Sequence, residues 1–200
     1  MGPVAADHFE QLYRADPDPW RVSSAWYERR KRRLLLAALG RERYRHAFEP
    51  GCGAGQLTQC LALRCARVSA ADIAPAAAAR CRARMAEKGL DHVDVLLLDL
   101  PRQWPAAPAR GFDLIVLSEV GYYLDDAALA RFLRGVDASL APGGEIVACH
   151  WRPDFDDRLQ STDTLHAAIG ALPGLTRRVH HEEAEFRLDL WRRQPQGSEP

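Results

Sequence analysis

Between residues 46 and 151, short apolar runs alternate with longer amphipathic stretches, which predicts a repeated order of strand and helix. Strands are expected at 47–49, 68–71, 92–98, 112–118 and 145–149. Helices are expected at 56–64, 75–88 and 126–140. The run 112–118 is almost continuously apolar, which is typical of a strand that is buried on both faces of a parallel sheet. This pattern predicts an open, doubly wound α/β fold.

The two flanks of this region have other patterns. Residues 1–45 are helical in character but contain Asp16-Pro17-Asp18-Pro19, and two prolines prevent a continuous helix. One helix is expected to be capped by Ser23 or Ser24 and to end at Gly40. After 151, a helix at 162–172 and strands at 176–183 and 186–191 predict a C-terminal hairpin. We therefore expect a Rossmann-like, mostly parallel seven-stranded sheet with an antiparallel hairpin over 46–193, and a flexible tail over 194–200.

Composition narrows the class of protein. The chain has 200 residues, 47% of them hydrophobic, and 27 Lys and Arg balance 27 Asp and Glu, which predicts one folded domain rather than a disordered chain. A neutral chain lacks the positive charge typical of nucleic-acid-binding proteins. No apolar run approaches the ~20 residues that span a bilayer, and the first residues do not resemble a secretory signal. Five cysteines without Cys-x-x-Cys spacing predict free thiols in a reducing cytoplasm. We expect a cytoplasmic protein without membrane or nucleic-acid partners.

The most informative motif is a glycine loop between a strand and a helix. Gly51, Gly53 and Gly55 alternate there, so the backbone can approach a ligand closely at the helix N-terminus. The spacing G-x-G-x-G differs from the G-x-G-x-x-G of nicotinamide enzymes. Asp72 and Asp99 end the second and third strands, at the same sheet edge as the loop. One carboxylate can accept ribose hydroxyls and the other an adenine amino group, so these residues outline a site for adenosine.

The motifs from the glycine loop to Asp99, with the turn Ala141-Pro142-Gly143-Gly144, resemble class I S-adenosylmethionine-dependent methyltransferases over residues 46–151. Further segments resemble the nodulation protein S family, namely Asp18-Pro19-Trp20, Trp26-Tyr27-Glu28-Arg29-Arg30-Lys31, Leu117-Ser118-Glu119-Val120 and Tyr122-Tyr123-Leu124. That family N-methylates the free amine of a deacetylated chitooligosaccharide. The resemblance weakens after Arg152, and Gly121 stands where a bulkier apolar residue is expected.

The resemblance implies a binding site for S-adenosyl-L-methionine, with S-adenosyl-L-homocysteine as product. Glu49 would hold the methionine amine, Asp72 the ribose and Asp99 the adenine. Residues 1–45 would form a lid, 46–151 the donor half, and 152–193 the acceptor side. The implied donor-site residues are Trp20, Trp26, Glu49, Gly51, Cys52, Gly53, Gly55, Asp72, Ile73, Asp99, Leu100, Ser118 and Glu119.

His150, just beyond the fifth predicted strand, is our candidate for a base that deprotonates the acceptor, with Glu119 and Tyr122 as partners. The alternative for His150 is a core histidine that is bonded to the backbone. Three other histidines, His166, His180 and His181, are expected at the surface. The basic run 29–33 is expected to be solvated, with one or two arginines turned toward the cofactor. No His, Cys or acidic cluster has metal-ligand spacing, so no metal is expected.

The predicted function is methyl transfer to a small-molecule acceptor, most simply the amine of an amino sugar or a similar metabolite. Three alternatives stay open at this point. The same donor could serve a hydroxyl, thiol or carboxyl acceptor. A non-catalytic module could bind S-adenosylmethionine without turnover. An RNA methyltransferase could use the basic run, although the chain has no Asn-Pro-Pro-Tyr tetrapeptide that would clamp a base.

Overall fold

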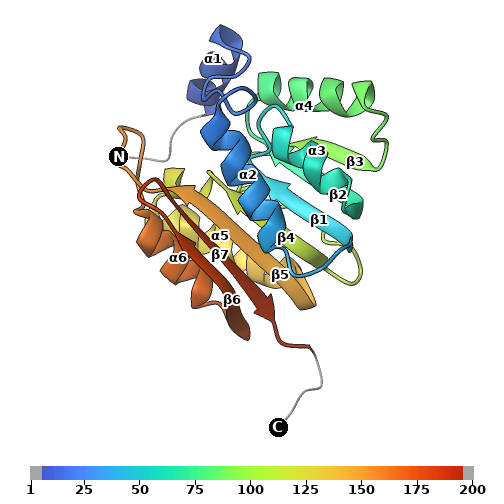
Figure 1. Ribbon diagram of the computed structural model, residues 1–200, viewed down its shortest axis with the longest axis vertical. Coiled ribbons are helices and arrows are strands. Elements are labelled where there is room, and N and C mark those ends of the chain that lie inside the picture. Colours follow the sequence, from blue (N-terminus) through green and yellow to red (C-terminus); the bar gives the residue numbers. More distant parts are fainter. Residues whose placement is uncertain (1–5, 196–200) are drawn as a thin grey trace.

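The computed structural model describes residues 6–195, so most of the predicted tail, 196–200, lies outside the described residues. Seven strands form one sheet, as predicted, and their order in the sheet is β3-β2-β1-β4-β5-β7-β6 (Figure 1). The elements are α1 (Ala6–Ala15), α2 (Trp26–Ala38), β1 (Tyr44–Pro50), α3 (Gln56–Ala62), β2 (Cys65–Asp72), α4 (Pro75–Glu87), β3 (Val93–Leu97), β4 (Phe112–Ser118), the 3₁₀-helix η1 (Gly121–Tyr123), α5 (Asp126–Ser139), β5 (Leu140–Trp151), α6 (Thr162–Gly170), β6 (Leu175–Glu182) and β7 (Phe186–Arg193).

The strand directions confirm the predicted mixed sheet. Strands β1 to β5 run parallel to one another, and β7 runs antiparallel to both β5 and β6. The winding reverses between β1 and β4, which are neighbours in the sheet. In open α/β sheets, ligands bind beyond the carboxyl ends of the strands at such a switch point. The fold therefore directs attention to the residues that follow Pro50 and Ser118.

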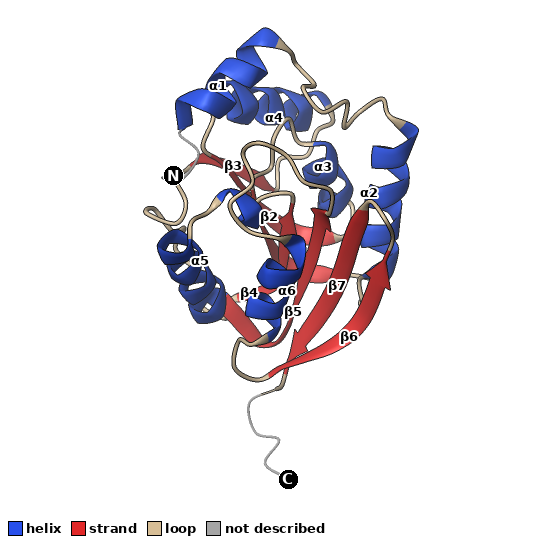
Figure 2. Cartoon of the chain, turned by 90° about the vertical axis from the view of Figure 1, so that its left-hand side faces the viewer, coloured by secondary structure: helices blue, strands red, loops and turns tan. Residues whose placement is uncertain are grey.

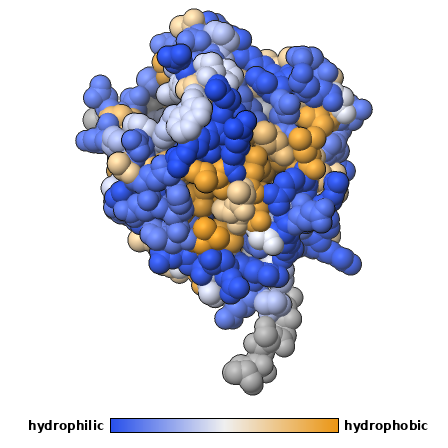
Figure 3. Space-filling view, in the orientation of Figure 1, coloured by the Kyte–Doolittle hydropathy of each residue, from blue (hydrophilic) through white to orange (hydrophobic). Residues whose placement is uncertain are grey.

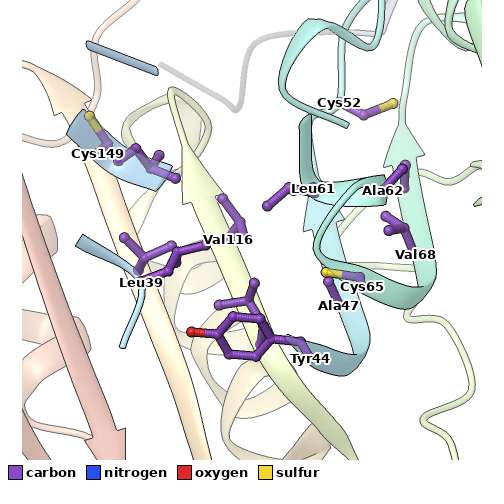
Figure 4. Packing of buried hydrophobic residues seen from close by; sticks show 14 of the residues in the cluster. Leu39, Tyr44, Ala47, Cys52, Leu61, Ala62, Cys65, Val68, Val116 and Cys149 are labelled. Carbon is purple, nitrogen blue, oxygen red and sulfur yellow. The ribbon is translucent and has the colours of Figure 1, made fainter. Parts of the chain in front are cut away.

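The central strands bury both faces because successive side chains point to opposite sides of the sheet. In β4, Leu114 and Val116 face one core cluster, whereas Ile115 and Leu117 face the other. Helices α2, α3 and α4 cover the first face, and α5 and α6 cover the second (Figure 2). Figure 4 shows part of the first cluster, in which Val116 of β4 lies in one core with residues of β1, β2 and α3 and with Leu39, which follows α2.

Two predicted boundaries are wrong for identifiable reasons. The predicted cap of α2, Ser23 or Ser24, is not used: the residue before the helix is Ala25, which makes no side-chain capping bond. β5 begins at Leu140 rather than at Glu145, because Leu140 already pairs with Phe112. Phe112 pairs with Leu140, but Leu114 pairs with Glu145, so the register of β4 against β5 shifts over the intervening residues of β5.

Surface polarity is uneven. On the face drawn in Figure 3, hydrophobic side chains gather in the middle and hydrophilic ones surround them.

Within residues 6–195, none of the helices combines the length and the apolar character that a bilayer span requires. All five cysteines are free thiols, four of them buried.

Candidate active site

A cavity of about 1090 Å³ opens at the switch point of the sheet. It is bounded by the glycine loop after β1, the ends of β2 and β4, η1, and residues from α1 and α2. The sequence-predicted residues that line it are Trp20, Glu49, Gly51, Cys52, Gly53, Asp72, Ile73, Asp99, Leu100, Ser118, Glu119 and Tyr122. Gly55, Trp26 and His150 are not lining residues. The fold thus gathers most of the predicted donor site around one cavity.

The glycine loop has the backbone shape that its sequence predicts. Gly51, Gly53 and Gly55 all have positive φ, of 71°, 54° and 83°. Such angles are accessible to glycine at little cost. The Gly53 amide donates a hydrogen bond of 2.8 Å to Asp72 Oδ2, and the Ala74 amide donates one of 2.9 Å to Oδ1. Burial raises the pKa of Asp72, and these two amides counteract the rise. Asp72 is therefore fixed against the loop, and each oxygen keeps a lone pair for a ligand.

Glu49 stands at the end of β1 with a free carboxylate oxygen. The residue is buried, and Oε2 has no hydrogen-bond partner among residues 6–195. Burial raises the pKa of Glu49 to about 8, and a hydrogen bond with Thr58 offsets only part of the rise. A buried polar atom without a partner costs about 1–3 kcal/mol, which a cationic ligand would recover. This atom fits the amine of S-adenosylmethionine.

One end of the cavity is formed by the residues that follow β3. Asp99 lines it, and its carboxylate pairs with Arg102 at 2.9 Å. The Asp99 backbone amide donates to Gln103 Oε1 at 3.0 Å, which fixes the turn after the strand. Leu100 supplies an apolar surface beside Asp99. An acidic and an apolar group here suit an adenine ring.

The opposite end of the cavity is built around Glu119, whose backbone φ is +56°. This conformation is strained for a residue other than glycine and costs of order 1–3 kcal/mol. It turns the carboxylate toward three donors. Oε1 accepts a hydrogen bond from Lys31 Nζ at 2.5 Å, while Oε2 accepts bonds from the Tyr122 hydroxyl and, at 2.9 Å, from the Trp151 amide.

Lys31 is a site residue that our sequence analysis missed. Although it belongs to the basic run, it is buried, and its ammonium also donates to Glu28 Oε1 at 2.8 Å. Burial alone would lower the pKa of Lys31, but the carboxylates of Glu119 and Glu28 raise it. Lys31 is therefore protonated and holds both carboxylates in place. The signal was the helical spacing, since Lys31 lies four residues from both Tyr27 and Leu35 on the inward stripe.

His150 is fully buried and lies behind Tyr122, with the two ring centroids 5.3 Å apart. Its Nδ1 is 3.0 Å from His166 Nε2, and His166 Nδ1 is 2.7 Å from Asp189 Oδ2. Because His166 donates to the carboxylate, its Nε2 accepts from His150, whose own Nε2 is left unprotonated. That atom has no hydrogen-bond partner within residues 6–195. Burial lowers the pKa of His150 well below its usual range.

The predicted surface position of His166 is wrong. His166 is buried because it lies on the inner face of α6 together with Thr162, Leu165 and Ile169. Burial lowers its pKa, and the bond to Asp189 works in the other direction. His180 is exposed and His181 half-buried, and His180 donates to the same Asp189 at 2.8 Å.

Helix α1 covers the cavity and contacts both of its ends. The Tyr13 hydroxyl lies 2.5 Å from where a Cβ on Gly53 would be, so only glycine leaves room for it. Glu10 Oε2 accepts a 2.8 Å bond from the Ala76 amide at the N-terminus of α4. At the other end, His8 pairs with Asp157 at 3.1 Å. Figure 1 shows α1 beside α4 at the top of the molecule.

Gly121 stands where our sequence analysis expects a bulkier apolar residue, and packing explains the glycine. A Cβ at Gly121 would lie 2.8 Å from both Cδ atoms of Leu165. Leu165 is buried on α6, so this side chain has little room to move. The close approach of α6 to η1 therefore requires glycine at this position.

Comparisons with known sequences agree on one family. The family described as Nodulation protein S (NodS) matches residues 6–158. Nodulation protein S of Sinorhizobium fredii (strain NBRC 101917 / NGR234) is 37% identical over 145 residues, covering 70% of this chain and 65% of that protein. The protein of the same name from Rhizobium tropici is also 37% identical over 145 residues, covering 70% of this chain and 59% of that protein. The match thus spans less than two thirds of each relative.

Solved structures share the same architecture. A Pseudomonas syringae protein described as a candidate methyltransferase is 44% identical, with a TM-score of 0.74, and the match covers 84% of this chain and 100% of that one. The N-methyltransferase NodS from Bradyrhizobium japonicum WM9, in complex with S-adenosyl-L-homocysteine, is 28% identical, with a TM-score of 0.80. That match covers 94% of this chain and 97% of the other.

Proposed function

The chain belongs to the nodulation protein S family, and from this premise we propose that it transfers a methyl group from S-adenosylmethionine to the amine of an amino sugar or similar small polar acceptor. The free oxygen of Glu49 carries the proposal, because a buried carboxylate at the end of β1 suits the donor's amine. At the opposite end of the same cavity, the carboxylate of Glu119, held by Lys31, Tyr122 and the Trp151 amide, supports the proposal.

At the donor end, five residues would hold the cofactor. Glu49 would receive the amine, the loop at Gly51 and Gly53 would lie against the amino-acid part, Asp72 would accept ribose hydroxyls, and Asp99 would face the adenine. S-adenosylmethionine, when bound, supplies a methyl group on a positively charged sulfur. Asp72 is already oriented by two backbone amides, so little ordering is needed when the ligand arrives.

At the acceptor end, Glu119 and Tyr122 would position the nucleophile. Glu119 is held by Lys31 and by the Trp151 amide, so the carboxylate cannot swing away from the cavity. Tyr122 donates to Glu119 and stacks edge-on with Phe155 at a centroid distance of 5.0 Å. These residues would place the acceptor and exclude water, which is most of what methyl transfer to a neutral amine requires.

His150 as the base stays a prediction. Its unprotonated Nε2 suits a proton acceptor, and Asp189 fixes that tautomer through His166. The variant His150→Asn keeps a donor toward His166 but lacks the basic nitrogen. If His150 is the base, turnover falls about 100-fold or more, and the part of the acid limb that His150 contributes, below its ordinary pKa, disappears. His92→Asn is the matched control, because the His92 ring contacts the Ala62 carbonyl, away from this network and from the cavity. An unchanged profile in His150→Asn means that His150 is structural.

Two experiments test the proposed function. First, S-adenosylhomocysteine should raise the melting temperature and NAD should not; Asp72→Asn should reduce the shift, while Asp94→Asn, on the exposed part of β3, should keep it. Second, donor consumption should be measured with deacetylated chitooligomers and other amines. Activity on hydroxyl, thiol or carboxyl acceptors alone would contradict the amine acceptor. Binding without turnover on any acceptor would favour a non-catalytic module.

A further inference from the structure

Four buried side-chain polar atoms have no hydrogen-bond partner among residues 6–195. Two of them belong to residues that line the cavity, the Glu49 carboxylate and the Tyr27 hydroxyl. The donor's amine accounts for Glu49. Nothing in the donor site accounts for Tyr27, which lies at the other end among the acceptor-side residues. A buried hydroxyl without a partner lowers the stability of the folded state. A bound ligand that forms a hydrogen bond with this hydroxyl would recover the lost free energy.

Tyr27 lines the cavity and is held firmly by its neighbours. It lies on α2 one turn before Lys31, whose ammonium is 5.1 Å from the centre of the Tyr27 ring. The ring also meets Trp151 and Phe186 edge-on, at centroid distances of 5.6 and 6.1 Å. These contacts restrict the ring on three sides, so its hydroxyl is preorganised rather than mobile.

The phenol of Tyr27 is neutral. Burial raises its pKa, Lys31 lowers it, and the carboxylates of Glu119 and Glu28 raise it again. A neutral phenol is both a hydrogen-bond donor and an acceptor. Glu119, by contrast, already receives bonds from Lys31, Tyr122 and the Trp151 amide. Within residues 6–195, Tyr27 is therefore a lining residue at this end of the cavity whose buried hydroxyl has no hydrogen-bond partner.

We infer that the Tyr27 hydroxyl is a specificity-determining contact for the methyl acceptor and accepts a hydrogen bond from its amine N–H. This inference rests on the proposed function. An amine fixed by an N–H bond to Tyr27 keeps its lone pair free to attack the methyl group. An acceptor without an N–H would leave the hydroxyl buried and unpaired, so primary and secondary amines are preferred over tertiary ones.

The variant Tyr27→Phe separates this role from a structural one. Removing an unpaired buried hydroxyl should raise the melting temperature of the free protein, whereas removing a bonded one should lower it. With deacetylated chitooligomers as acceptor, kcat/KM should fall about 3- to 10-fold, and the affinity for S-adenosylhomocysteine should stay the same. The preference for a primary over a tertiary amine should shrink by the same factor.

The matched control is Tyr44→Phe. The Tyr44 hydroxyl donates to Glu145 and accepts from the Arg41 amide, and Tyr44 does not line the cavity. This variant should melt at a lower temperature and keep its kcat/KM.

A Tyr27→Phe protein that melts lower than the wild type, or that keeps its kcat/KM, overturns the inference alone. A wild type that binds S-adenosylhomocysteine but methylates no amine overturns the proposed acceptor, and the inference with it.

Discussion

At the scale of single residues, two residues that line the cavity are in energetically unfavourable states in the free protein. Glu49 is buried with a free oxygen, and its pKa is raised to about 8. Glu119 keeps a left-handed backbone at the end of β4. Residues in such states persist when the surroundings determine them, and they concentrate at functional sites.

Glu49→Gln tests the donor end. The neutral amide removes a charge-assisted hydrogen bond, so the affinity for S-adenosylhomocysteine should fall about 10- to 100-fold, measured by calorimetry. In the wild type, binding the ammonium requires the carboxylate to lose its proton. Affinity should therefore rise from pH 6 to pH 8, and in the variant it should not. Glu87→Gln, exposed at the end of α4, is the control; equal affinities in wild type and Glu49→Gln would contradict the assignment.

The positions of candidate site residues were predictable from the sequence where those residues followed strand ends. Glu49, Asp72 and Glu119 each occupy the carboxyl end of a strand, and such ends meet at one edge of a parallel sheet. Lys31 and His166 were missed because polar residues were assumed to be exposed. Both lie at helical spacings from buried neighbours, and counting those spacings would have placed them inward.

At the scale of elements, helix α1 is held by a few polar contacts rather than by a large core. Glu10 caps the N-terminus of α4 through the Ala76 amide, and Arg80 donates to the Tyr13 carbonyl at 3.0 Å. Its buried apolar contacts are few, with Tyr13 as the buried residue of the helix. An element with such contacts opens more readily than the sheet beneath it.

Glu10→Ala should loosen α1 without unfolding the domain. The variant loses the bond to the helix N-terminus of α4, so amide exchange in residues 6–15 should become about two- to fivefold faster. Release of S-adenosylhomocysteine should accelerate by a similar factor. Gln11→Ala, on the exposed side of the same helix, should leave both rates unchanged. If exchange in α1 does not respond to Glu10→Ala, the capping bond does not hold the helix.

Element boundaries were less predictable than element order. Strand and helix order follow from hydrophobic periodicity, which local sequence contains. The start of β5 depends on Leu140 pairing with Phe112, which is a contact between distant segments. The requirement for Gly121 likewise comes from Leu165 on α6, more than forty residues along the chain. Local sequence contains neither contact.

At the scale of the whole molecule, stability should pass through a maximum near pH 6.5. Below this pH, unfolded His150 and His166, with ordinary pKa values of about 6.5, bind protons that the folded residues exclude. Stability therefore falls as the pH falls. Above it, folded Glu49 retains a proton up to about pH 8 that the unfolded residue has lost, so stability falls as the pH rises.

Urea unfolding between pH 5.5 and 8 measures this profile. The slopes approach about 1.4 kcal/mol per pH unit for each net proton. Glu49→Gln should remove the decline above pH 6.5, and saturating S-adenosylhomocysteine should do the same by ionising the wild-type carboxyl. A stability that rises steadily to pH 8 in the unliganded wild type would contradict the raised pKa of Glu49.

The position of α1 has a kinetic consequence. Tyr13 rests against the loop at Gly53, and His8 pairs with Asp157, so one short helix contacts both ends of the cavity. A ligand that left the cavity past α1 would require the helix to move. In an enzyme that worked in this way, the closed state would serve chemistry and the open state would serve exchange of ligands. In such an enzyme, the opening rate of α1 sets an upper limit on kcat.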